Sequence, residues 1–347
     1  MKRIIPLVWL VVSWQLGCAD SRPSGRRVHE SPPGSPPVAL ADYLRTQDVA
    51  GLQSVQIWPN RFGPGLCLNT RHYRILTTVA DRCFLSKLPG FVEAVHRSYT
   101  EQLPVAVLPD TRSTLYLFAT RSQWEVFTRR FAGRQARLFL KIQEGAYCLD
   151  GSCVVYDIGP ERTLAAIGHE GWHQFTSRHF KYRLPSWLDE GIAMQFENPA
   201  TLDGQLSFDS CDNHYRLHSL ERVVKNRQCM PLVDLLTVSP GEVMALDSDA
   251  SVTAFYSQSY ALVRFLQEAD NGRYLARYRA MLDGGLLGTW PLSKKCRRIA
   301  ADRNRARTVR WNSQVGKQIF THYVHPDPQG LEAEYFDFCE RIVAGLP

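Results

Sequence analysis

Residues 164–175 read LAAIGHEGWHQF, an apolar-periodic stretch that predicts a buried helix. Within it, His169 and His173 stand four residues apart, so both imidazoles leave the same face of the helix. Two imidazoles at that spacing can bind one metal ion, and zinc suits the geometry. Glu170 follows the first histidine, where its carboxylate could take a proton from a water on the metal without binding the metal itself.

A second stretch offers a third protein ligand. Residues 185–197 read PSWLDEGIAMQFE, and Glu190 lies near the start of this second apolar-periodic segment. We expect Ser186 to cap the helix and Asp189, three residues later, to approximate a capping box. Glu190 would then sit in the first turn and face the two histidines. The alternative is a pair of amphipathic helices whose polar faces are exposed to solvent.

The two motifs together resemble a known group of enzymes. HEGWH followed by WLDEG resembles the gluzincin branch of zinc metallopeptidases, in which a glutamate ligand follows HExxH in a W-L-x-E-G segment. More narrowly, the chain is similar to the bacterial peptidase-MA-like secreted domains, which share HEGWHQF, WLDEG and a later Y-x-Q-S segment, here residues 256–259. The resemblance covers roughly residues 73–282. It implies a zincin-like fold, a Zn2+ ion held by His169, His173 and Glu190, and Glu170 as the general base.

The resemblance also implies a hydrogen-bond donor for the oxyanion, taken from a Tyr or His on a later helix. Tyr256 and Tyr260 stand one turn apart, and Tyr256 is the first candidate because it opens the shared segment; core packing is the alternative for each. Relatives place an acidic residue soon after the third ligand to orient a zinc histidine, but Met194 occupies the position four after Glu190. Asp189 either takes that orienting role or acts only as a helix cap.

Hydrophobic periodicity predicts an α+β fold, with strands first and helices second. Strands are expected over residues 74–79, 114–119, 138–142 and 153–158, and helices over 89–102, 122–131, 160–177, 186–197, 251–269, 271–283 and 328–344. These elements make one domain, 46–347, with a sheet-rich part (46–158) and a helical part (159–347) that carries both motif helices. A substrate would lie along an edge strand before the zinc helix, and 153–158 is the candidate.

The N-terminus has the order of an export signal. MKRIIPLVWLVVSWQLGC begins with two cations, continues with an uncharged stretch too short to span a bilayer comfortably, and ends with Cys18 after a small residue. Leu16-Gly17-Cys18 resembles a bacterial lipoprotein processing box. We therefore expect a signal peptide (1–17), a lipidated Pro/Ser-rich tether (18–45) and attachment to the membrane of a bacterial cell envelope. The alternatives are plain secretion and a buried Cys18.

The other eight cysteines suit a chain sent to an oxidising compartment. They fall into four couples of sequence neighbours, at 67 and 83, 148 and 153, 211 and 229, and 296 and 339. Cys148 and Cys153 are expected to close a hairpin across its own turn. Buried free thiols are the alternative.

Two further patterns are not assigned a site. His214 and His218 also stand four apart, but no Glu follows the first and no partner helix is evident, so we expect a surface pair. Residues 294–310 carry eight cations against Asp302, and the whole chain has a net charge of +7. Since an exported chain does not meet nucleic acid, we expect a solvated loop with no nucleic-acid partner, with anionic lipid or cell-wall polymer as the alternative.

Together, these patterns predict an exported zinc-dependent hydrolase, a metallopeptidase acting on a peptide or protein substrate, although amide or ester hydrolysis would use the same residues. The alternative is a non-catalytic cell-surface lipoprotein that keeps a structural zinc and acts as a binding module. Glu170 favours the enzyme, because a purely structural site has no use for a free carboxylate beside the metal.

Overall fold

The structure is a computed structural model that describes residues 37–103, 105, 107, 112–142, 145–202, 205–208, 213–246, 248–302, 312–344 and 346. The predicted signal peptide, the lipidation site at Cys18 and most of the predicted tether lie outside these residues. The described chain divides into two compact units. The sheet unit holds residues 37–96 and 112–167, and the helical unit holds residues 97–107 and those from 168 onward.

The sheet unit is built on six strands in the order β1-β2-β3-β4-β6-β5. Antiparallel pairing joins β1 to β2, β2 to β3 and β5 to β6, whereas β3, β4 and β6 are parallel neighbours. The central strands are largely buried, as expected of parallel strands covered on both faces. Their bounds are β1 (Ser54–Ile57), β2 (Leu66–Asn69), β3 (Tyr73–Thr77), β4 (Ser113–Phe118), β5 (Ala146–Leu149) and β6 (Ser152–Tyr156).

Helices connect these strands and flank the sheet. They are α1 (Pro37–Thr46), α2 (Arg82–Glu101), α3 (Arg121–Phe131), the short 3-10 turn η1 (Gly133–Gln135) and α4 (Ala136–Phe139). Helix α1 occupies the last part of the segment expected to be tether and buries Leu40 and Leu44. Helix α3 begins at a capping box between Thr120 and Gln123.

The strand expected over 138–142 is wrong. Residues Ala136–Phe139 form helix α4, and the next residues continue as turns. A short apolar run does not by itself distinguish a strand from a buried helical turn. Here Phe139 stacks on Tyr147 of β5 with 3.9 Å between ring centroids, and Ile142, beyond the end of α4, is also buried.

The hairpin expected between Cys148 and Cys153 is confirmed. Asp150 and Gly151 connect β5 to β6 with φ angles of 49° and 70°, which suits the two-residue turns that join antiparallel strands. Cys148 and Cys153 are directly opposed in the register. The disulfide between them stays a prediction.

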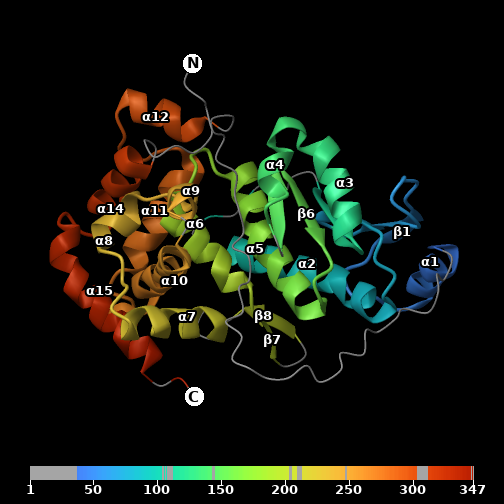
Figure 1. Ribbon diagram of the computed structural model, residues 1–347, viewed down its shortest axis with the longest axis horizontal. Coiled ribbons are helices and arrows are strands. Elements are labelled where there is room, and N and C mark those ends of the chain that lie inside the picture. The colour runs from blue at the N-terminus through green and yellow to red at the C-terminus, as the bar shows by residue number, and fades with distance from the viewer. Residues whose placement is uncertain are drawn as a thin grey trace. The chain divides into compact units, whose positions relative to one another are not determined.

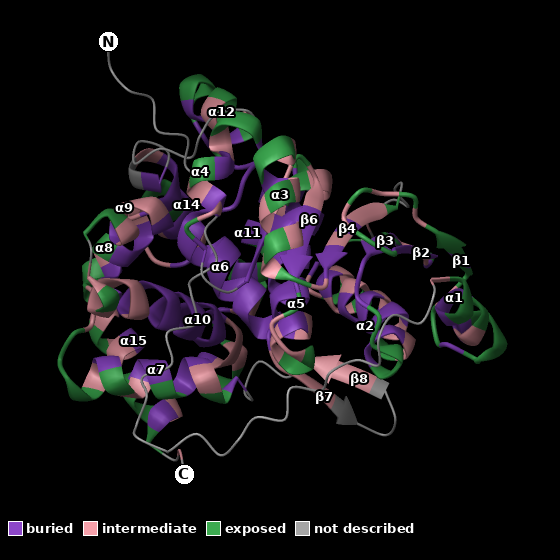
Figure 2. Ribbon diagram, turned by 45° about the vertical axis from the view of Figure 1, so that its right-hand side comes forward, coloured by how far each residue is buried: buried purple, intermediate pink, exposed green. Residues whose placement is uncertain are grey.

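The helical unit is arranged around α10 (Asp249–Gly272), which packs against α6, α7, α9, α11 and α15 (Figure 1). Residues 254–266 of α10 are all buried, and Figure 2 shows this helix almost wholly in the buried colour. The bounds of its elements are α5 (Pro160–His179), α6 (Ser186–Ala193), η2 (Met194–Phe196), β7 (Pro199–Leu202), β8 (Gln205–Phe208), α7 (His214–Lys225), α8 (Leu232–Thr237), α9 (Pro240–Ala245), α11 (Leu275–Leu287), α12 (Lys294–Ala301), η4 (Asn312–Gly316), α14 (Lys317–Tyr323) and α15 (Pro328–Val343).

The α+β class and the order of sheet before helices are confirmed, as are the helices expected over 160–177, 186–197, 251–269, 271–283 and 328–344, within a few residues at their ends. The boundary between the two units falls within α5, after Ile167, so His169, His173 and Glu190 all belong to the helical unit. Among the described residues, no helix is both long and apolar enough to span a membrane.

Candidate metal centre

Helix α5 brings the two histidines of the HExxH motif together. His169 and His173 are 2% and 3% exposed, and their Nε2 atoms lie 3.2 Å apart. The helix approaches the turn η2 closely, because a Cβ at Gly168 would overlap the carbonyl oxygen of Phe196. Tyr99 also donates its hydroxyl proton to the Gly168 carbonyl at 2.5 Å, which fixes this part of α5.

Helix α6 supplies the third donor atom. Glu190 Oε2 lies 3.3 Å from His169 Nε2 and 3.6 Å from His173 Nε2. Atoms bound to one tetrahedral zinc at its usual bond length of about 2.0–2.1 Å lie about 3.3 Å from one another. The three donor atoms therefore form a triangle of the size that such an ion requires.

Gly191 allows α6 to approach α10. A Cβ there would overlap the carbonyl oxygen of Ser259, so a larger residue would push α6 away from the buried helix.

The predicted cap of α6 is wrong: Ser186 is the first helical residue, and its hydroxyl accepts a hydrogen bond from Asn312 Nδ2 at 2.7 Å. Pro185 precedes it at the cap position, where its ring already sets the backbone angle. The whole of α6 is buried, so the alternative with exposed polar faces is also wrong.

A carboxylate lies beside the Nδ1 atom of each histidine, on the side of the ring away from the facing Nε2 atoms. His169 Nδ1 lies 2.8 Å from Glu197 Oε1, and His173 Nδ1 lies 3.4 Å from Asp189 Oδ1. A proton shared on Nδ1 leaves the Nε2 lone pair directed at the metal position. Asp189 thus makes the contact with His173 that its orienting alternative requires.

Glu197 is not predicted by the sequence pattern, because it lies seven residues after Glu190, beyond Met194. Arg216 grips Glu197 with two charge-assisted hydrogen bonds, Nε to Oε2 at 2.8 Å and Nη2 to Oε1 at 2.6 Å. Asn213 adds a third at 3.0 Å and donates also to the Met194 carbonyl at 2.8 Å. All these side chains are buried, so the pair acts in a medium that screens it little.

Glu170 follows His169 on α5, and its carboxylate is fully buried. Neither of its oxygens has a hydrogen-bond partner among the described residues. Burial raises its pKa to about 7, although the imidazoles of His173 and His169 oppose that rise. A buried carboxylate without partners costs free energy unless a ligand or water satisfies it, so this orphaned group fits a metal with its water beside it.

The charged side chains of the centre shift one another's pKa values. Burial alone would lower the pKa of His173, but Glu190 and Asp189 outweigh it and raise that pKa to about 10. Burial would raise the pKa of Glu190, but the two imidazoles lower it to about 2. A divalent cation would compete with protons for the imidazole nitrogens.

Tyr256 lies near the carboxylates of the centre. Its side chain is buried on α10, with the Arg216 guanidinium 5.8 Å from its ring centroid. Burial, followed by the charges of Glu190 and Glu170, raises its pKa well above the ordinary value, so it stays protonated and able to donate. Tyr260 is also buried, one turn further along α10, and its ring lies 5.8 Å from the guanidinium of Arg264.

Three other expectations are settled. The strand expected to be the edge for substrate is wrong: β6 has β4 on one side and β5 on the other, so β5 is the edge. His214 and His218 are exposed on α7, which confirms the surface pair. The loop expected over 294–310 is wrong in its first part, because Lys294–Ala301 form helix α12. The lysines and arginines of α12 are exposed as expected, and residues 303–311 lie outside the described part of the chain.

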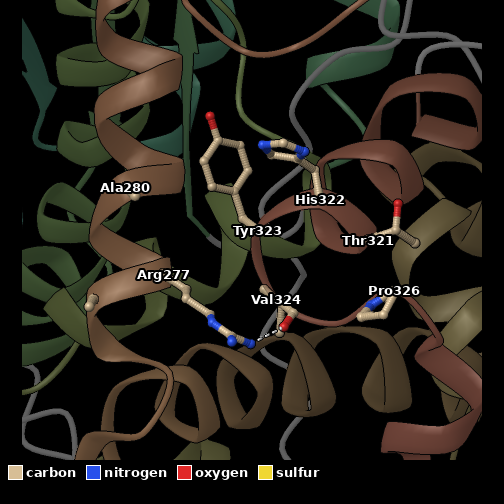
Figure 3. Close-up of a pocket in the computed structure, with 8 residues that line it drawn as sticks. Arg277, Ala280, Thr321, His322, Tyr323, Val324 and Pro326 are labelled. Atoms are coloured by element: carbon tan, nitrogen blue, oxygen red, sulfur yellow. Dashed lines mark hydrogen bonds between the residues drawn. The ribbon is translucent and has the colours of Figure 1, made fainter.

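A shallow pocket of about 430 Å³ lies elsewhere in the helical unit, between α11 and the end of α14 (Figure 3). Arg277 crosses it and donates to the Val324 carbonyl at 2.8 Å. None of the metal-centre side chains lines this pocket. It is therefore separate from the buried cluster.

The structure thus holds a buried His169–Glu170–His173 group whose donor atoms lie within 4.8 Å of one another and could hold a metal ion. Comparison of the chain with family models and with curated proteins finds no match.

Proposed function

We propose that the chain is an exported zinc-dependent hydrolase, a metallopeptidase of gluzincin-like type with a zincin-like fold. His169, His173 and Glu190 would hold the ion, and Glu170 would be the general base. The observation that carries this proposal is the conjunction of a zinc-sized triangle of donor atoms with a buried carboxylate that lacks a partner in the described structure. A purely structural site does not need that carboxylate.

A bound zinc would supply Lewis-acid polarisation of a water and of the scissile carbonyl. Glu170 would take the proton of the attacking water and later return it to the leaving amine. Tyr256 would donate its hydroxyl proton to the developing oxyanion, a role for which burial keeps it protonated. Glu197 and Asp189 would act as positioning residues that hold His169 and His173 in one orientation.

The export and anchoring of the chain remain part of the proposal. Cys18 and the proline-rich tether support attachment to a bacterial membrane through a lipid. Full-length protein made in a bacterial host should partition with membranes, and Cys18→Ser should release it. If labelled fatty acid never enters the wild type, simple secretion replaces this part of the proposal.

The experiment that tests the enzyme compares the wild type with Glu170→Gln on a peptide pool at equal zinc occupancy. The variant should keep zinc and fold, while turnover falls by roughly two or more orders of magnitude, the usual scale for loss of general-base help. Glu221→Gln, on the surface of α7, is the matched control and should retain full turnover. Equal cleavage by wild type and Glu170→Gln would contradict the assigned base.

The same experiment separates the enzyme from a binding module. If neither protein cleaves any peptide while both bind a peptide, the result supports the alternative hypothesis, a non-catalytic lipoprotein with a structural zinc. Substituting Tyr256 by Phe should cost less than substituting Glu170, because a neighbouring water or Tyr260 would partly replace the lost donor, whose full contribution is roughly 3 to 4 kcal/mol at most.

A further inference from the structure

Two cysteines distant in sequence lie on neighbouring segments of the helical unit. Cys339 is 1% exposed on α15, and Cys229 is partly buried in the segment that joins α7 to α8. Both are thiols in the structure. Helix α15 packs against both α7 and α8, so the two segments run beside each other.

Hydrogen bonds fix how these segments are aligned. The backbone N–H of Leu232 donates to Glu332 Oε2 on α15 at 2.6 Å. Two residues earlier, Met230 is held by the side chain of Gln258, which accepts from its N–H at 2.7 Å and donates to its carbonyl at 2.9 Å. The backbone carbonyl of Gln258 accepts a hydrogen bond from the Tyr335 hydroxyl at 2.8 Å. From Leu232 back toward Cys229, the segment between α7 and α8 therefore runs along α15 toward the C-terminal end of that helix.

The lengths of the two segments agree. From Glu332 to Cys339 is seven residues of helix, which rise about 10 Å and make about two turns, so both residues lie on one face. From Leu232 back to Cys229 is three residues, which cover about 10 Å when extended. Both distances are measured from the contact between Leu232 and Glu332. At about 10 Å from that contact, α15 reaches Cys339 and the connecting segment reaches Cys229.

The electrostatics of the thiols agree with this placement. Burial is the main cause that raises the pKa of Cys339 to about 12, and the neighbouring Cys229 raises it further. Burial likewise raises the pKa of Cys229, and Glu340, the residue next to Cys339, adds to that rise. Each thiol therefore lies within electrostatic reach of the other or of its neighbour.

We propose that Cys229 and Cys339 form a disulfide that ties α15 to the segment between α7 and α8. This bond is independent of the proposed hydrolase activity. It replaces two of the couples of sequence neighbours, in which Cys229 would pair with Cys211 and Cys339 with Cys296.

The bond forms by exchange with an external disulfide, either a small molecule or a protein oxidant. The Cys229 thiolate attacks one sulfur of that disulfide, expels one thiolate and forms a mixed disulfide. Cys339 then loses its proton, and its sulfur attacks the Cys229 sulfur and expels the second thiolate. Two protein thiols become one disulfide, and the external disulfide is reduced to two thiols.

Peptide mapping tests the bond directly. The full chain is refolded with reduced and oxidised glutathione, its free thiols are alkylated, and it is digested with trypsin without reduction. Cys229 and Cys339 lie in the tryptic segments 228–264 and 318–341, each of which holds a single cysteine. We expect these two peptides as one cross-linked species that reduction separates. Alkylation of both cysteines, or linkage of Cys229 to Cys211 or of Cys339 to Cys296, would overturn the proposal.

Thermal unfolding gives an independent measurement. Adding a reductant should lower the melting temperature of the oxidised wild type by about 5 to 10 °C more than that of Cys229→Ser, because the bond closes a long loop. Cys339→Ser removes the other sulfur of the same bond and should give the same response as Cys229→Ser. Equal responses in the wild type and Cys229→Ser would count against the bond.

Discussion

Among the described residues, the metal centre and a second cluster each join two histidines to a glutamate, and they differ in what binds the atoms behind the facing nitrogens and oxygens. In the metal centre, Glu197 and Asp189 hold the Nδ1 atoms of the histidines, so both Nε2 atoms turn toward Glu190. In the sheet unit, His72 and His96 stack with ring centroids 4.0 Å apart, and Glu93 lies beside them. The outer cluster has the same residue types at the surface of α2.

In the outer cluster, formed by His72, His96 and Glu93, both oxygens of the Glu93 carboxylate already accept hydrogen bonds. Glu93 Oε1 accepts from the His72 backbone N–H at 2.8 Å, its Oε2 lies 2.7 Å from His72 Nδ1, and Thr70 adds another hydrogen bond. It therefore fastens the turn between β2 and β3 to α2. A histidine–carboxylate cluster can therefore hold a metal ion when other groups bind the rear atoms and leave the facing atoms available.

The largest contrast should appear in metal content. Wild-type protein purified with zinc should hold about one zinc per chain, and His173→Ala should lose it because two donors remain. His72→Ala is the matched change in the outer cluster and should keep the metal. Elemental analysis measures both, and absence of zinc in the wild type would refute the metal centre.

The next contrast concerns the groups behind the histidines. Glu197→Gln keeps a hydrogen-bond acceptor for His169 but removes the charge, so zinc affinity should fall by roughly ten- to a hundredfold. Glu93→Gln makes the same change in the outer cluster and should leave affinity unaltered. Competition against a chromophoric chelator gives the two dissociation constants. An unchanged constant for Glu197→Gln would show that His169 is oriented without this carboxylate.

A third contrast concerns the glycines of the two helices. Gly168→Ala should lower the free energy of unfolding by roughly 3 kcal/mol, because the new Cβ meets the Phe196 carbonyl oxygen, a backbone atom that cannot swing away. Gly90→Ala in α2 meets Ala50 only at 3.4 Å and should be neutral or stabilising by about 0.5 kcal/mol. Denaturation of the metal-free proteins measures both, and equal stabilities would contradict the close approach of α5 and η2.

The smallest effect belongs to the outer cluster and depends on pH. Burial would raise the pKa of Glu93, but hydrogen bonds from Thr70 and His72 outweigh it and hold that pKa below 4.5. A depressed folded pKa stabilises the protein above the unfolded value and loses that contribution as the pH falls through the folded value. Glu93→Gln should therefore cost about 1 kcal/mol at neutral pH, a small amount because water screens the half-buried pair.

The cost of Glu93→Gln should shrink as the pH falls below 4.5, as measured by denaturation at several pH values. A cost that is constant across that range would mean that the charge of Glu93 does not contribute.

The sequence was informative where structure depends on local periodicity. The helices that carry His169 and Glu190, and the hairpin that contains Asp150 and Gly151, follow from spacing that short-range geometry obeys. Glu197 could not be found in this way, since its role requires Arg216, which is 19 residues away and follows the β7–β8 hairpin. Polar pairing between separate elements leaves no periodic trace in a sequence.

Strands and caps show the same limit. The strands β1 and β2 were missed because each is only four residues long, which is too short for alternation to stand out. Ser186 looked like a helix cap from its residue type, but Asn312, 126 residues away, takes its hydroxyl as an acceptor. Tertiary contacts of that length decide which of several local possibilities is used.

The side chains of the metal centre come from one short length of chain. His169 and Glu197 are 28 residues apart, and Glu197 and Arg216 are 19 apart, so the loops that their contacts close are small and cost little entropy. The centre therefore has low contact order and can assemble early in folding, before α10 has been synthesised. The long helix α10, which buries the centre, comes later in the chain, and its Gln267 closes a loop of 165 residues to Gln102.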